Sequence, residues 1–136
     1  MTLTDAGPLI ALIDAGESDH ELCREALNGI GLPLLTTWPA FAEAMYVLGA
    51  RAGWSGQHAL WRMLAKNGLE LAELDHGLTA RIAELMERYR DHPMDLADAS
   101  LVAVAEVRGL RQIFTLDAHF RSYRVRGGGF LEVLPG

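Results

Sequence analysis

The chain has 136 residues, half of them hydrophobic, and a formal net charge of −6 at pH 7. This length fits one globular domain over residues 1–136, and no apolar run approaches the roughly 18 residues that a membrane span requires. The single cysteine, Cys23, excludes an internal disulfide and a cysteine-rich metal cluster, so we expect a soluble, cytoplasmic protein with no membrane partner.

Two strand-to-helix units are predicted at the start of the chain. Residues 1–4 form a short apolar, β-branched run that predicts a strand, and Pro8 suits the first turn of a helix. A helix over residues 19–29 leads to a buried strand over residues 33–37, and a further helix begins at Trp38. This alternation is typical of α/β proteins.

An acidic side chain follows each of these two strands. Asp5 stands at the end of the first strand, where open α/β sheets place their ligands. Glu43 lies near the start of the helix after the second strand. Both residues also have simpler explanations, because Asp5 would serve as an N-cap and Glu43 would suit a solvent-facing position.

The middle of the chain predicts a turn, a helix and a strand. Residues 49–56 are expected to form a turn before a helix that ends at residues 67–68, and residues 69–74 predict a strand. We expect Trp54 and Trp61 to pack in the core; an exposed apolar patch for a partner is the alternative.

An amphipathic helix follows this strand. Asp75 is its predicted N-cap, and Glu84 and Arg88 have the spacing of an i,i+4 ion pair. The apolar positions of this helix recur with helical spacing: Leu78, Ile82, Leu85 and Tyr89.

The segment Met94 to Glu106 places two carboxylates at the entrance to an apolar helix. Asp95 and Asp98 lie on one side of its first turn, and residues 101–105 are apolar nearly all round, which predicts a buried helix. One acid is explained by N-capping and the helix dipole, worth roughly 0.3–1 kcal/mol. Two acids at a buried helix end indicate a metal site if further acids converge there.

The C-terminal part predicts two strands with a basic loop between them. Residues 111–115 predict a strand followed by Asp117, and His119 is expected to be a turn residue rather than a ligand. Residues 121–129 are expected to form a mobile loop before a last strand over residues 130–134. Three arginines of this loop would suit contacts with a nucleic-acid backbone, with a solvated surface as the alternative: Arg121, Arg124 and Arg126.

The predicted elements assemble into a parallel, doubly wound sheet that brings the acids together. Asp5 and Asp117 would lie at carboxyl ends of strands, and Glu43 and Asp98 at helix starts along the same edge, so all four can face one crevice. Four carboxylates in one crevice repel one another, which raises their pKa values unless a cation neutralises them.

Such a cluster of oxygen ligands suits Mg²⁺ or Mn²⁺, and an ion held there can activate water for attack on a phosphodiester. With four acidic charges gathered at one site, the rest of the chain is close to neutral. The acidic total therefore does not exclude a nucleic-acid substrate.

Four segments, in this order, resemble the PIN-domain ribonucleases and, among them, the VapC-type toxins of toxin-antitoxin pairs: LTDAGPLIALID, TTWPAFAEAMYVL, DLADASLVAVAE and FTLDAHF. The resemblance implies a PIN-like (Rossmann-like) three-layer fold with a central, mostly parallel sheet of four to five strands flanked by helices. It also implies a metal-dependent endoribonuclease that cuts single-stranded RNA, with Mg²⁺ or Mn²⁺ held by an acidic quartet: Asp5, Glu43, Asp98 and Asp117. Thr115 matches a supporting hydroxyl beside the last acid, and Asp95 would be a cap, a supporting group or an additional ligand.

The resemblance further implies an antitoxin partner and a homodimer, for which several apolar side chains are candidates: Trp38, Phe41, Met45, Trp54 and Trp61. A function of a different class stays open, namely a catalytically inactive PIN-fold interaction module whose acids only cap helices or face solvent. Other hydrolytic schemes find no support, because the chain has no G-x-S-x-G, H-E-x-x-H or G-x-x-x-x-G-K-[ST] motif.

Overall fold

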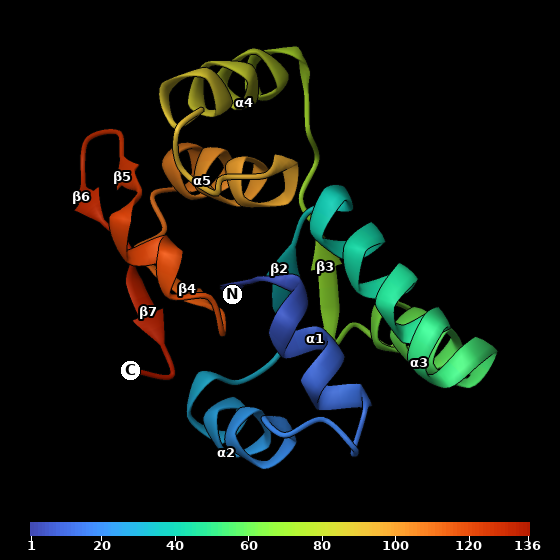
Figure 1. Cartoon of the computed structure of the whole chain (residues 1–136). Coiled ribbons are helices and arrows are strands. Elements are labelled where there is room, and N and C mark those ends of the chain that lie inside the picture. Colours follow the sequence, from blue (N-terminus) through green and yellow to red (C-terminus); the bar gives the residue numbers. More distant parts are fainter.

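The computed structural model describes residues 1–136 as a parallel sheet between two layers of helices, with a small hairpin at one side (Figure 1). The sheet contains β1 (Thr2–Thr4), β2 (Leu34–Thr36), β3 (Leu69–Leu71), β4 (Gln112–Phe114) and β7 (Glu132–Leu134), and the antiparallel hairpin contains β5 (Arg124–Val125) and β6 (Gly129–Phe130). The strand order is β3-β2-β1-β4-β7, and all four pairings are parallel. The predicted three-layer α/β fold is therefore confirmed.

The helices cover both faces of the sheet (Figure 1). They are α1 (Ala6–Ile13), α2 (His20–Ile30), α3 (Trp38–Ala65), α4 (His76–Arg88) and α5 (Leu96–Arg108), and a short 3₁₀ helix, η1, spans Ala118–Ser122. Alternate side chains of each strand point to opposite faces, so Leu34 joins the core under α1, α2 and α3, whereas Leu35 joins the core under α4 and α5. No helix is both long and apolar enough to cross a lipid bilayer.

The strand order reverses between β1 and β4. From β1 the chain builds outward through β2 and β3 on one side, and β4 and β7 extend the other side. Open α/β sheets bind ligands at the carboxyl edge of such a switch point. Asp5 directly follows β1, and Asp117 comes three residues after the end of β4, so both acids lie beside the switch point.

The prediction of a turn over residues 49–56 is wrong, because α3 continues through that segment. Only Gly53 departs from helical geometry, with φ 62° and ψ −153°, and it kinks the helix. That conformation is open to glycine and strained for other residues. The flanking alanines, Ala50 and Ala52, favour helix, so the chain resumes the helix directly after the kink.

The expectation that Trp54 and Trp61 pack in the core is also wrong. Their exposed fractions are 65% and 41%. The kink at Gly53 leaves Trp54 on the outside, where it stacks on His58 with ring centroids 5.5 Å apart. The alternative of an exposed apolar surface on α3 is the one that the structure supports.

The predicted basic loop over residues 121–129 contains ordered secondary structure. It holds the end of η1 and the β5-β6 hairpin, in which Arg124 pairs with Phe130 and Val125 with Gly129. The last strand is correspondingly shorter than predicted and begins at Glu132.

Helices α4 and α5 follow the sequence pattern closely. Asp75 caps α4 by accepting a hydrogen bond from the backbone N–H of Leu78, at 2.9 Å. The four apolar positions predicted for this helix are all buried, as is most of α5. The predicted ion pair with Arg88 is wrong, because Glu84 lies 3.2 Å from Arg81 and 3.6 Å from Arg126 instead.

Candidate active site

Five carboxylates line one crevice of about 450 Å³ at the carboxyl edge of the sheet. They come from different elements of the fold: Asp5, Glu43, Asp95, Asp98 and Asp117. Asp5 follows β1, Glu43 is on α3, Asp95 and Asp98 begin α5, and Asp117 precedes η1. The structure thus brings together all the acids that the sequence analysis singled out.

Asp5 is buried, with an exposed fraction of 8%, and both of its carboxylate oxygens accept hydrogen bonds. Its Oδ1 accepts a hydrogen bond from the backbone N–H of Ala6 at 2.8 Å, and its Oδ2 accepts one from the Thr115 hydroxyl at 2.8 Å. Burial raises the pKa of Asp5, and the charges of Asp117 and Asp95 raise it further, while both hydrogen bonds act in the opposite direction. Asp5 is therefore an N-cap and a crevice carboxylate at once.

Asp95 and Asp98 form a reciprocal capping box at the start of α5. The backbone N–H of Asp98 donates to Asp95 Oδ1 at 2.8 Å, and the backbone N–H of Asp95 donates to Asp98 Oδ2 at 3.4 Å. Asp98 is 5% exposed, and burial, reinforced by the charges of Asp95 and Asp5, raises its pKa to about 8. Capping explains one oxygen of each side chain and leaves the second oxygen of each without a donor.

Glu43 lies on the exposed side of the first turns of α3 and has no hydrogen-bond partner. Partial burial raises its pKa, and the charges of Asp95, Asp5 and Asp117 raise it further. A buried hydrogen bond of 2.6 Å between the Thr37 and Ser100 hydroxyls ties the start of α3 to α5. This bond sets where Glu43 stands relative to Asp98.

Thr115 and Asp117 complete the crevice after β4. The Thr115 hydroxyl, which donates to Asp5, also accepts a hydrogen bond from the backbone N–H of Asp117 at 3.0 Å. Asp117 Oδ1 accepts from the backbone N–H of His119 at 2.9 Å and lies 2.7 Å from its Nδ1. Asp117 is half-buried, and its partner His119 also lines the crevice.

Tyr123 is a site residue that the sequence analysis missed. Its side chain is fully buried, and its hydroxyl donates to Asp98 Oδ2 at 3.2 Å. Burial and the Asp98 charge raise the Tyr123 pKa, which keeps the hydroxyl protonated as a donor. The sequence offered no local signal, because this tyrosine stands among basic residues in a segment that reads as a loop.

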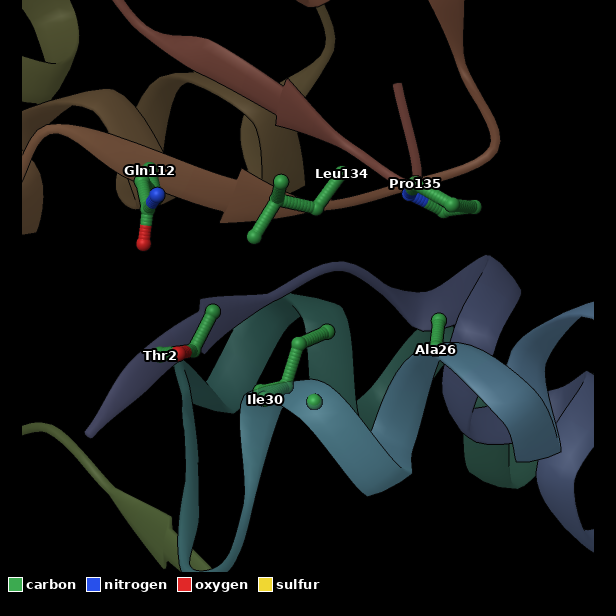
Figure 2. A pocket seen from close by; sticks show the side chains of 7 residues that line it. Thr2, Ala26, Ile30, Gln112, Leu134 and Pro135 are labelled. Carbon is green, nitrogen blue, oxygen red and sulfur yellow. The ribbon is translucent and has the colours of Figure 1, made fainter.

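A hollow of about 340 Å³ between α2 and the strands β1, β4 and β7 has different chemistry (Figure 2). Figure 2 shows its lining, which has no ionisable side chain: Thr2, Ala26, Ile30, Gln112, Leu134 and Pro135, with Gly29. General acid-base and metal chemistry need ionisable or ligating groups. The acidic crevice is therefore the candidate site.

The oxygen atoms that line the acidic crevice are of the type that binds hard divalent cations. All its charged donors are carboxylate oxygens, which Mg²⁺ and Mn²⁺ prefer. Burial raises the pKa values of Asp5 and Asp98, and the charges of neighbouring acids raise them further, so a cation would relieve an unfavourable concentration of negative charge. No three acidic, histidine or cysteine side chains are already close enough together to hold one ion. Glu43 and Asp95 are the exposed members of the crevice, and Asp117 is half-buried. Asp5 and Asp98 are the buried pair.

Comparison with known proteins identifies the family. A model of the PIN domain family matches residues 2–125. The chain belongs to the PIN-domain family. This PIN domain is 32% identical over 134 residues to Ribonuclease VapC26 of Mycobacterium tuberculosis, covering 98% of the chain and 99% of that relative. The resemblance drawn from the four sequence segments is confirmed.

Solved structures show the same fold. The crystal structure of Mycobacterium tuberculosis VapC20, described as a Sarcin-Ricin loop cleaving toxin, has a TM-score of 0.82 at 20% identity, with 98% of each chain covered. A toxin-antitoxin complex from Klebsiella pneumoniae has a TM-score of 0.66 at 18% identity, covering 86% of this PIN domain and 87% of that chain. At these identities the likeness concerns the fold.

Proposed function

We propose that this PIN domain is a divalent-metal-dependent endoribonuclease that hydrolyses phosphodiester bonds in single-stranded RNA and acts as the toxin of a toxin-antitoxin pair. The observation behind the proposal is the convergence of acids from four separate elements on one crevice at the switch point of the sheet. The relationship to Ribonuclease VapC26 supports the reaction class. We place the protein in the cytoplasm, where its RNA substrate is found.

In this proposal Asp5, Glu43, Asp98 and Asp117 hold Mg²⁺ or Mn²⁺, with Asp95 as a possible additional ligand. The bound ion would supply an activated water and would stabilise the negative charge that develops on the phosphate. The protein holds Asp5 in position through Thr115 and Asp98 through Tyr123, so that neither buried carboxylate has to reorganise.

We also propose an antitoxin partner and a homodimer. The support is the Klebsiella pneumoniae toxin-antitoxin complex with the same fold, together with an exposed aromatic surface on α3. The exposed aromatic side chains of this surface are Trp38, Trp54 and Trp61, with exposed fractions of 53%, 65% and 41%, and the first and last of these both pack against Phe41. Exposed aromatic side chains of this size are typical anchors of protein interfaces.

Binding of Mg²⁺ should stabilise the protein, because the ion relieves repulsion that exists only in the folded state. We expect the melting temperature at pH 8 to rise by about 5–10 °C at saturating Mg²⁺, corresponding to ~2.7 kcal/mol at one hundred times the dissociation constant. Differential scanning fluorimetry measures this, with NaCl of matched ionic strength as control. An equal response to both salts would favour the catalytically inactive interaction module.

Replacing Thr115 by valine should weaken metal binding without unfolding the protein. The substitution removes the hydroxyl that donates to Asp5 and accepts from the backbone of Asp117. Loss of a hydrogen bond that orients a ligand lowers metal affinity by about 10–100-fold. The measurement is a Mg²⁺ titration by calorimetry. Thr79→Val, at an exposed position of α4, is the matched control, and equal affinities for the two variants would contradict the role given to Thr115.

A further inference from the structure

Four arginines converge on a second pocket, of about 210 Å³, outside the acidic crevice. Arg81 and Arg88 come from α4, two helical turns apart, and Arg124 and Arg126 come from the β5 segment, with Val125 between them. We name this the arginine pocket. Its members are far apart in the sequence, and only the packing of the hairpin against α4 and α5 brings them together.

A buried ion pair builds one wall of the arginine pocket. Arg81 donates from Nε to Glu106 Oε1 at 2.8 Å and from a terminal nitrogen to Glu106 Oε2 at 3.0 Å, and both side chains are largely buried. Glu106 Oε2 also accepts a hydrogen bond from the backbone N–H of Arg126 at 2.7 Å. These bonds join the hairpin to the two helices at this wall of the pocket.

The arginine pocket holds an excess of positive charge. Only two carboxylates, Glu84 and Glu106, pair with its four guanidinium groups, and neither Arg88 nor Arg124 forms a salt bridge. The guanidinium of Arg124 lies 5.2 Å from the ring centroid of Phe130, which supports it without neutralising it. Two guanidinium groups that line one pocket without a carboxylate partner are suited to a phosphate group.

The arginine pocket is joined to the acidic crevice by two tyrosines. The Tyr123 hydroxyl donates to Asp98, and Arg124 is the next residue along the chain. The backbone N–H of Arg124 donates to the Tyr89 hydroxyl at 2.9 Å, and the two tyrosine rings pack with centroids 5.2 Å apart. The buried Tyr123 therefore contacts an acid of the crevice through its side chain and is joined through the backbone to an arginine of the pocket.

We propose that the arginine pocket binds a backbone phosphate of the RNA strand, next to the segment that enters the acidic crevice. This inference rests on the proposed ribonuclease function. A polyanionic strand that approaches five carboxylates on a chain of net charge −6 is repelled, and unpaired arginines beside the crevice would offset that repulsion. Phosphate contacts of this kind position a strand without reading its sequence.

The test measures RNA binding without cleavage. Fluorescence anisotropy of a labelled single-stranded RNA is recorded in EDTA, over a series of salt concentrations, for Arg88→Gln, Arg124→Gln and the double variant. We expect each single variant to bind about 3–10-fold more weakly, and the slope of log affinity against log salt to fall by about 0.7 per lost phosphate contact. The matched control is Arg62→Gln, an exposed arginine on α3 away from both sites.

Each outcome of this test decides for or against the proposal. Equal affinities and salt slopes for the double variant and Arg62→Gln would overturn it, as would a wild-type protein that does not bind RNA. If the double variant loses binding only to an acidic peptide such as oligoglutamate, the pocket recognises protein and the RNA proposal fails. Binding is measured without catalysis, so the two proposals can fail separately. If the double variant binds RNA more weakly but the wild-type protein never cleaves RNA, the phosphate-binding proposal stands and the proposed ribonuclease activity is refuted. Both arginines are exposed, and unchanged melting temperatures would show that the variants fold.

Discussion

Replacing Asp98 by asparagine should abolish RNA cleavage. Asp98 is the most buried carboxylate of the crevice, and its Oδ1 has no donor within the protein, so this oxygen is available to a cation. Asparagine keeps the shape and the capping oxygen but removes the charge. Loss of one metal ligand at the reacting centre should lower the cleavage rate by ~10³-fold or more, about 4 kcal/mol of transition-state stabilisation. The measurement is single-turnover cleavage of labelled RNA with added Mg²⁺.

The same substitution should make the metal-free protein more stable at alkaline pH. Burial and the charges of Asp95 and Asp5 raise the pKa of Asp98 from 3.8 to about 8 in the folded protein, so the folded state holds this proton more tightly than the unfolded state. The contribution is complete below about pH 4 and is lost as the pH rises through 8. In EDTA, wild-type stability should therefore decline from pH 5 to 8.5, whereas Asp98→Asn should decline less and melt at least about 5 °C higher at pH 8.

A matched control separates this effect from a general change of charge. Asp91→Asn makes the same chemical change at an exposed position between α4 and α5, outside the crevice. It should keep wild-type cleavage and the wild-type dependence of stability on pH. Cleavage at the wild-type rate by Asp98→Asn would show that Asp98 is not a ligand in the proposed metal centre. A melting temperature of Asp98→Asn below that of the wild type at pH 8 would show that the Asp98 charge does not destabilise the folded state.

Replacing Glu106 by glutamine should give the largest loss of stability. The Glu106 side chain is 6% exposed and accepts two hydrogen bonds from Arg81 and one from the backbone of Arg126. Glutamine has one acceptor oxygen for these three donors and leaves the largely buried Arg81 with the exposed Glu84 carboxylate as its remaining partner. Breaking a buried pair in this way costs about 3–5 kcal/mol, or roughly 10–20 °C in melting temperature. Calorimetry or chemical denaturation at pH 7 measures the change.

The dependence on pH gives this prediction a second readout. Burial raises the pKa of Glu106, but hydrogen bonds from Arg81 and Arg126 outweigh burial and hold the pKa below 4.5 in the folded protein. The folded state therefore holds this proton less tightly, and the stabilisation is present at neutral pH and lost as the pH falls below about 4.5. The stability difference between wild type and Glu106→Gln should shrink toward acidic pH.

Glu84→Gln is the matched control for Glu106→Gln. Glu84 also pairs with Arg81, at 3.2 Å, but its side chain is 61% exposed, so its loss should change stability by at most about 0.5–1 kcal/mol. Glu106→Gln should also release the hairpin that Arg126 joins to α5, which limited trypsin digestion would detect as faster cleavage after Arg124 and Arg126. Equal stability of the two variants would show that the buried pair does not hold the hairpin in place.

The sequence by itself determined the order of strands and helices and the positions of the acids within that order. Helix starts such as Asp75 and Asp95 are local, because a cap requires only a side chain and the backbone three residues later. The apolar pattern of α4 and the continuous apolar run of α5 likewise predicted burial from neighbouring residues alone. In a parallel sheet the carboxyl ends of the strands lie along one edge. The predicted strand and helix order was therefore enough to predict that Asp5, Asp98 and Asp117 lie near that edge.

Only the tertiary structure decided which groups meet across the fold. Tyr123 donates to Asp98 across 25 residues of chain, and Thr115 donates to Asp5 across 110 residues, and no local pattern encodes either contact. The same holds for the pair of Arg81 with Glu106, and for Glu84, which pairs with Arg81 and Arg126 instead of the expected Arg88. Local sequence sets backbone propensity, whereas burial, pKa shifts and charge pairing depend on how distant segments pack. The sequence therefore indicated Arg124 and Arg126 as candidates for nucleic-acid contacts, but only the tertiary structure placed them in one pocket with two arginines of α4.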